Sequence, residues 1–158
     1  MSDPGDLVEV RIVGLPMDVF RETSEHTDEL LREFALIREW EAEDGNSRHV
    51  PRRLLDLVER LGRDFSGFTG QQEAQLQAAV QEGVPSVDLT YRVPAAARQA
   101  CIELGGMLDE ADEFCRQGQE LLTLASPPRD VAFRNWFLGE FVRQIDGEAP
   151  LTWEDAPK

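Results

Sequence analysis

The chain has 158 residues, the usual length of one domain, and 41% of them are hydrophobic, an ordinary share for a protein with its own core. Its net charge of −15 repels nucleic-acid phosphates and anionic lipid surfaces, so neither nucleic-acid nor membrane partners are expected. No apolar run approaches the ~20 residues that span a bilayer. The first six residues lack the apolar core of a secretory signal, so a cytoplasmic protein is predicted.

The first predicted element is a strand over residues 7–15, in which apolar and charged residues alternate. Pro16 ends this strand and can start a helix. Apolar residues then recur with the period of a helix, which predicts a helix from 17 to about 42. A second helix is predicted from 51 to about 65, and the segment Ser-Gly-Phe-Thr-Gly at 66–70 ends it.

The opening pattern returns after a third, weakly apolar helix that is predicted at about 71–82. Residues 87–93 alternate like the first strand, a proline follows, and a long helix is predicted from 95 to about 122. The two strand–proline–helix units, 8–40 and 87–118, indicate a loose internal duplication. Their strands are expected either to form one small sheet, with helices on its apolar face, or to pair across a dimer.

The last predicted helix begins after Ser126, its expected N-cap, with Pro127 in the first helical position, and runs to Ile145. Residues 1–147 are therefore predicted to form a single helical α+β domain. It is predominantly helical, with two short strands in the duplicated strand–Pro–helix pattern and four or five helices. Residues 148–158 have no helical or strand period and are predicted to form an extended C-terminal tail.

Residue types that carry catalysis or bind metals are sparse. Cys101 and Cys115 lie on the same predicted helix, about 21 Å apart along its axis, which is too far for a disulfide bond. With two scattered histidines they make no zinc cluster. Lysine occurs once, at Lys158, and there is no glycine-rich phosphate loop and no nucleophile elbow. We expect no enzyme activity, no metal and no cofactor.

Two residues are candidates for phosphorylation, although a structural explanation is simpler for each. His26 has a glutamate about one turn before it and another about one turn after it, so we expect a histidine on the helix surface among carboxylates. Ser66 lies where the second helix breaks. The acidic runs 39–44 and 109–113 are predicted to be solvated helix faces.

Two groups of residues are candidates for binding a partner protein. Arg48, Arg52 and Arg53 form a local basic cluster that either binds a phosphate or an acidic surface, or balances the acidic run before it. Trp136 and Trp153 either close the core or form a docking surface, and for Trp153 the tail position favours a partner. The nearby aromatic stripe predicted to be core consists of Phe133, Phe137 and Phe141.

Three segments carry a family resemblance. They are Leu-Pro at 15–16 before the acidic helix, Asp-Glu-Ala-Asp-Glu-Phe-Cys at 109–115, and the aromatic segment 133–145 followed by Trp153. In these the chain resembles a family of small uncharacterised proteins of high-GC Gram-positive bacteria. That family is associated with partner-switching loci, beside anti-sigma factor kinases, STAS-domain antagonists and PPM-type phosphatases. The kinase nucleotide loop, Asp-x-Gly-x-Gly, and the STAS phosphosite, Asp-Ser-x-Gly, are missing, so the resemblance implies an accessory protein.

The sequence therefore predicts a non-catalytic regulatory protein that acts by protein–protein interaction, with a signalling regulator as its expected partner. A homodimer stays open, and the partner and the signal are not specified. The alternative is a sensor that binds a small molecule between its helices. A pocket with convergent polar groups would favour the sensor, whereas an exposed apolar patch rimmed by charge would favour a partner-binding module.

Overall fold

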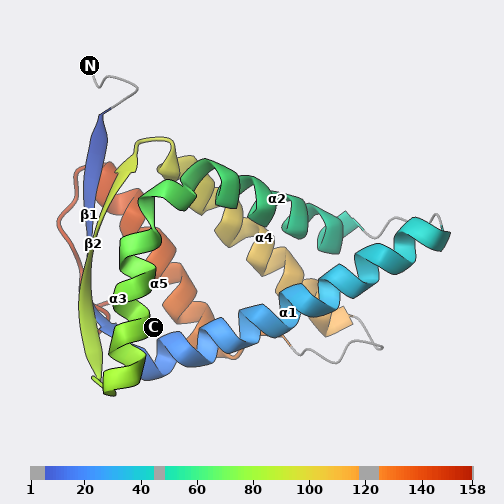
Figure 1. Ribbon diagram of the computed structural model, residues 1–158, viewed down its shortest axis with the longest axis horizontal. Coiled ribbons are helices and arrows are strands. Elements are labelled where there is room, and N and C mark those ends of the chain that lie inside the picture. The colour runs from blue at the N-terminus through green and yellow to red at the C-terminus, as the bar shows by residue number, and fades with distance from the viewer. Residues whose placement is uncertain (1–5, 45–48, 118–124, 158) are drawn as a thin grey trace.

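A two-stranded sheet stands at one end of the molecule, and five helices extend from it or cover it (Figure 1). The computed structural model describes residues 6–44, 49–117 and 125–157. The elements in chain order are β1 (Leu7–Pro16), α1 (Met17–Asp44), α2 (His49–Phe65), a 3-10 turn (Ser66–Phe68), α3 (Gly70–Glu82), β2 (Ser86–Pro94), α4 (Ala97–Gln117) and α5 (Pro128–Ile145). The predicted α+β class, with a predominance of helix, is confirmed.

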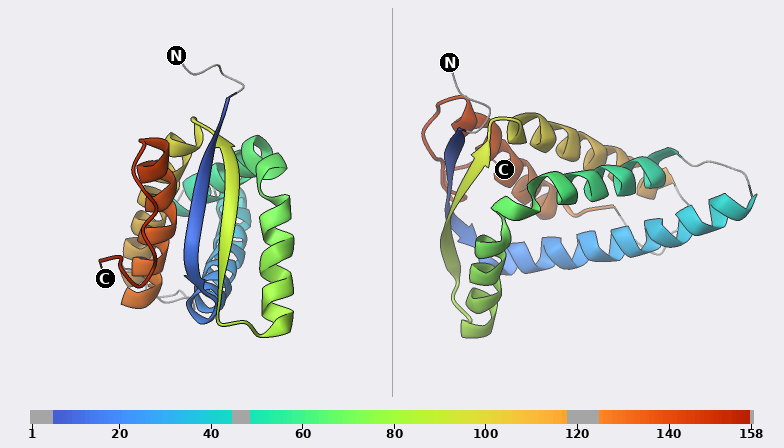
Figure 2. Two further views of the ribbon diagram at one scale, coloured as in Figure 1. Left: turned by 90° about the vertical axis from the view of Figure 1, so that its left-hand side faces the viewer. Right: turned by 45° about the horizontal axis from the view of Figure 1, so that its top comes forward.

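The two strands pair with each other in antiparallel orientation within one chain, which confirms the predicted small sheet and removes the need for pairing across a dimer. Val10 lies opposite Tyr91 and Ile12 lies opposite Leu89, and all four side chains are buried. The intervening side chains are polar and exposed. Figure 2 shows this outer face, with α5 along one side of the sheet and α3 along the other.

A bulge at Gly14 shifts the alternation of β1 near its end. Between the pairs Ile12–Leu89 and Leu15–Val87, β1 has two residues where β2 has only Asp88. Gly14 adopts a φ of 71°, a conformation that favours glycine, and its N–H donates to Asp88 Oδ1 at 2.8 Å. Because of this extra residue, Leu15 also points into the core, where it is fully buried.

Glutamine side chains from the flanking helices bind the outer edges of both strands. Gln144 of α5 accepts from the Arg11 N–H and donates to the Arg11 carbonyl, both at 2.8 Å. On the opposite edge, Gln72 of α3 donates to the Thr90 carbonyl at 2.5 Å, and Gln75 donates to the Asp88 carbonyl at 3.2 Å. The helices thus satisfy backbone groups that a third strand would otherwise pair.

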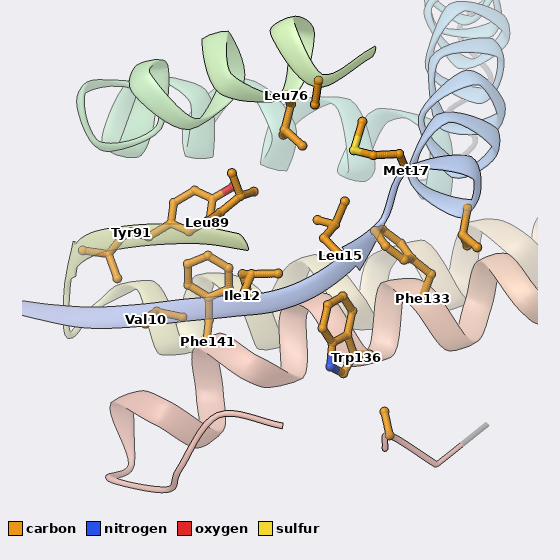
Figure 3. Packing of buried hydrophobic residues seen from close by; sticks show 14 of the residues in the cluster. Val10, Ile12, Leu15, Met17, Leu76, Leu89, Tyr91, Phe133, Trp136 and Phe141 are labelled. Carbon is orange, nitrogen blue, oxygen red and sulfur yellow. The ribbon is translucent and has the colours of Figure 1, made fainter. Parts of the chain in front are cut away.

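Two apolar clusters form the core of the described residues. The first lies between the sheet, α3 and α5, and Figure 3 shows the inner-face side chains of both strands filling the space between these helices. The predicted stripe of Phe133, Phe137 and Phe141 belongs to this cluster, which confirms it as core. The second cluster joins α1, α2 and α4 around Phe34 and Leu54, which are both fully buried.

The other helix boundaries lie within about two residues of the prediction, with one correction, while the predicted end of α4 at about 122 lies outside the described residues. Gly83 and Gly147 have positive φ and stand just after α3 and α5, as expected for residues that end helices. The predicted N-cap at Ser126 is wrong, because α5 begins at Pro128 and Pro127 holds the cap position. Ser126 instead donates from its N–H and its hydroxyl to Asp112 of α4.

Replacing Gly14 by alanine should lower the free energy of unfolding by about 1–2 kcal/mol, because an L-residue is strained at this φ. A Cβ at this position would meet only Thr152 Cβ at 4.0 Å, so the substitution isolates backbone strain from steric clash. Gly62→Ala is the matched control, because Gly62 lies inside α2 with open space around it. It should stabilise the protein by up to about 1 kcal/mol. Urea unfolding measures the free energy of unfolding of both variants. If the two substitutions changed it in the same direction, the bulge assignment would be contradicted.

Candidate functional site

Trp136 and Trp153, the aromatic candidates for partner binding, pack on each other and on their own domain. Trp136 is 6% exposed, and its indole Nε1–H donates to the Leu151 carbonyl at 2.8 Å. The Trp153 ring lies 5.7 Å from that of Trp136 and 5.9 Å from that of Phe133, measured between ring centroids. Both indoles therefore pack as side chains that close the core, which is one of the two roles that the sequence left open. A partner role for Trp153 was favoured because a free tail could carry it to a partner, and the packing of Trp153 on its own domain removes that reason.

The C-terminal tail lies along α5 because buried Glu140 binds it. Glu140 is 1% exposed, and its Oε1 accepts from the Leu151 N–H at 2.8 Å and from Gln144 Nε2 at 3.1 Å. Arg143 forms an ion pair with Glu140 and donates from Nη2 to the Ala149 carbonyl at 3.0 Å. The tail was predicted to be extended; within residues 148–157 it forms no helix or strand, and these contacts hold it back along the helix.

Trp136→Ala should destabilise the fold by about 3–5 kcal/mol, since it removes a buried ring and the hydrogen bond to Leu151. Trp153→Ala should cost less, because this side chain is only half-buried. Leu36→Ala on α1 is the control, because Leu36 is exposed and should change stability by less than about 0.5 kcal/mol. Thermal and urea unfolding test this, and an unchanged stability of Trp136→Ala would show that the ring is not core.

The three arginines of the predicted basic cluster do not act as one group in the structure. Arg48 lies outside the described residues, and Arg52 is exposed. Arg53 forms an ion pair with Glu110 of α4 at 3.4 Å, and this partner is on a different helix from the acidic run 39–44. Arg53 thereby becomes part of a groove between α2 and α4.

This groove, the α2–α4 groove, is a surface depression of about 740 Å³ with an apolar floor and charged rims. The ion pairs Arg53–Glu110 and Arg60–Glu103 show that α2 and α4 run antiparallel, side by side as in Figure 1. The floor consists of Leu57, Ile102, Gly106 and Met107. Ile102 is 44% exposed, so the groove leaves apolar surface in contact with water.

His26 is only partly on the helix surface that the sequence suggested, because its side chain is half-buried. Its Nε2 atom is shielded from water, as are Thr23 Oγ1 and both carboxylate oxygens of Asp130 on α5. Asp130 is 2% exposed. Burial raises the pKa of its carboxyl, and the Glu22 carboxylate raises it further, while His26, the Thr23 hydroxyl and Arg129 lower it. No sequence pattern predicted this cluster, because an acid in the first turn of a helix is ordinarily solvated.

Asp130→Asn should stabilise the protein increasingly as the pH rises. The pKa of Asp130 is higher in the folded protein than its ordinary value of 3.8, so the folded state binds a proton more tightly than the unfolded state does. This contribution to the free energy of unfolding is complete below pH 3.8, and it is lost as the pH rises through the raised pKa. The difference in free energy of unfolding between variant and wild type should therefore grow from about pH 3 to pH 7.

Asp146→Asn is the control with the opposite sign. A hydrogen bond from Arg98, at 2.8 Å, lowers the pKa of Asp146, so wild type should gain over this variant as the pH rises. Urea unfolding at several pH values tests both variants. A pH-independent difference for Asp130→Asn would show that the cluster is not buried in solution.

The acidic run at 109–113 also needs a correction. Asp112 is 3% exposed and not solvated. Its Oδ2 pairs with Arg134 of α5 at 3.2 Å, while its Oδ1 accepts the two hydrogen bonds from Ser126. Arg134 also binds Asp109 at 2.6 Å. This network joins α4 to α5, which is a structural role that the composition of the run did not reveal.

Several chemical possibilities can be compared with the described residues. Neither cysteine is in a disulfide bond, and burial raises the pKa of both thiols to about 11, so neither is a thiolate at neutral pH. Ser66 is exposed in the 3-10 turn. Within residues 6–44, 49–117 and 125–157, no group of three or more His, Cys, Asp or Glu side chains is arranged to hold a metal ion.

Comparison with known proteins adds no assignment. No protein-family model, no curated protein and no solved structure matches this chain. Among the described helices, none is both long enough and apolar enough to span a bilayer. The functional argument therefore depends on the surface features of the structure itself.

Proposed function

We propose that the protein is a non-catalytic regulator that acts by binding another protein, and that an amphipathic helix of this partner docks in the α2–α4 groove. The observation that carries the proposal is the apolar floor, with Ile102 exposed, between two charged rims. This is the arrangement that favours a partner-binding module over a sensor. Helix-in-groove recognition uses such a floor to bury an apolar helix face.

The dimensions of the groove suit a short helix. Its α2 side extends from Arg53 to Arg63, and its α4 side from Ile102 to Glu110. At the rise of an α-helix, the α2 side is about 15 Å long, which matches roughly three turns of a docked helix. Gly106 has no side chain, and a Cβ there would meet nothing within 4 Å, so a partner helix can approach closely at the centre of the floor.

The rims give the partner a charge pattern. The α2 rim is mainly basic, with three arginines at 53, 60 and 63 and one acid, Asp56, and the α4 rim carries Glu103 and Glu110. A complementary helix has acidic residues along one border of its apolar stripe and basic residues along the other. When such a helix docks, its charges would pair with the charged residues of the two rims and replace the two ion pairs that now cross the groove. Exposed pairs of this kind contribute only about 0–1 kcal/mol each, so the exchange is inexpensive, and it fixes the orientation of the partner.

The family resemblance directs the choice of partner. It associates the chain with partner-switching systems, so an anti-sigma factor kinase and a STAS-domain antagonist from the same cell are the first proteins to assay. An accessory role in such a system needs binding and release, and it needs no catalytic group in this chain.

Gly106→Leu should abolish partner binding without unfolding the protein, because its side chain would enter the open groove. Affinity should fall at least tenfold, as measured by calorimetry with the purified candidate partner. The matched control is Gly62→Leu on the same pair of helices, which also meets open space but lies outside the groove lining. It should bind like wild type.

A charge exchange provides the second test. In the double variant Arg60→Glu, Glu103→Arg, the pair across the groove can still form, but the charges of the two rims are reversed at that position. Stability should be unchanged and affinity should fall about tenfold. Binding of the same partner by Gly106→Leu with wild-type affinity would refute docking in this groove. If the protein self-associates and Gly106→Leu abolishes this self-association, the groove binds a second copy of the chain, and the proposal of a foreign partner in the groove is refuted.

A further inference from the structure

A second concave surface lies between α5 and the tail. This α5–tail cleft has a volume of about 560 Å³, within the range of small-molecule sites. Two positions on α5 that are about two turns apart, Ala132 and Gly139, are too small to fill it, and the tail forms the facing wall with Leu151 and Pro157. Trp136 lies between them in the lining.

The walls of the cleft are fixed by hydrogen bonds that do not depend on a ligand. Trp136 and Glu140 both bind the backbone of Leu151, and Arg143 binds the Ala149 carbonyl. A Cβ at Gly139 would meet nothing within 4 Å, so the space beside it is open. A cleft with fixed walls loses little conformational entropy when it binds a ligand, which favours affinity.

The charges that line the cleft are unusual for this chain. Two arginines, Arg116 and Arg143, face one acid, Glu140, although the whole chain carries a net charge of −15. Glu140 and Arg143 already bind each other. Among the residues that the structure describes, Arg116 forms an ion pair with Glu113, one turn away on α4, and both side chains are more than half exposed. Its guanidinium can therefore exchange that contact for a ligand at little cost.

We propose that the α5–tail cleft binds a small carboxylic acid with a flat apolar body. The carboxylate pairs with the Arg116 guanidinium, whose planar fork matches a carboxylate in two-point contact. The apolar body lies against Trp136 and fills the space beside Gly139. Asn135, which is exposed at the rim, offers a further hydrogen-bond donor. This site shares no lining residue with the α2–α4 groove, so it is distinct from the proposed docking site.

Titration with naphthalene-2-acetate tests the site, and naphthalene-2-acetamide serves as the neutral probe of the same shape. The readout is the NMR resonance of the Trp136 indole N–H, which donates to Leu151 at the wall of the cleft. The acid should shift this resonance and saturate below about 10 mM, as expected for a ligand of this size. The amide should bind about tenfold more weakly.

Two variants separate the contribution of the arginine charge from that of the open space beside Gly139. Arg116→Gln should weaken the acid about tenfold and leave the amide unchanged, while Gly139→Leu should abolish binding of both probes. Gly106→Leu fills the other groove and should bind the acid like wild type, so failure of this proposal and failure of the proposed docking are distinguishable. The absence of a saturable shift, equal affinity for acid and amide, or an unaffected Gly139→Leu would each overturn the assignment.

Discussion

The polar edges of a two-stranded sheet are the constraint on which this fold depends. A lone pair of strands is marginal in water and leaves a row of backbone N–H and C=O groups unpaired on each side. Here Gln144 occupies one edge with a donor and an acceptor, as a neighbouring strand would, while Gln72 and Gln75 donate to the other. These bonds fix α5 and α3 against the sheet and thereby define the space that the first core cluster fills.

Helix α5 extends this role to the rest of the molecule. Its aromatic stripe packs under the sheet, Glu140 binds the tail, and Arg134 reaches Asp109 and Asp112 on α4. Buried ionic contacts of this kind are expensive to break, because removal of one partner leaves an uncompensated charge. The sheet, the tail and α4 are therefore all positioned by one helix, and the α5–tail cleft is a consequence of the bonds through Glu140.

The sequence predicted what depends on local periodicity. Strand alternation, the helical phenylalanine stripe and the glycines that end α3 and α5 follow from backbone geometry, and all were found where expected. It failed where tertiary contacts override composition. Asp112 and Asp130 have the same local signature as solvated acids, and contacts outside their own helix bury them. The tail has no period, so its packing depends on Glu140 and Trp136, which no sequence pattern links to it.

Helix α4 borders both concave surfaces, since Ile102 and Glu110 line the α2–α4 groove and Arg116 lines the α5–tail cleft. A ligand in one site can influence the other only if the two sites favour different arrangements of a shared element. The contacts of α4 are unequal. Toward α5 it is held by the buried Arg134 network, whereas toward α2 it shares the second apolar cluster, and the ion pairs at the groove are exposed and weak. A shift of α4 would therefore repack the cluster that it shares with α1 and α2, and the partner affinity of the groove is the quantity in which communication between the sites would be measured.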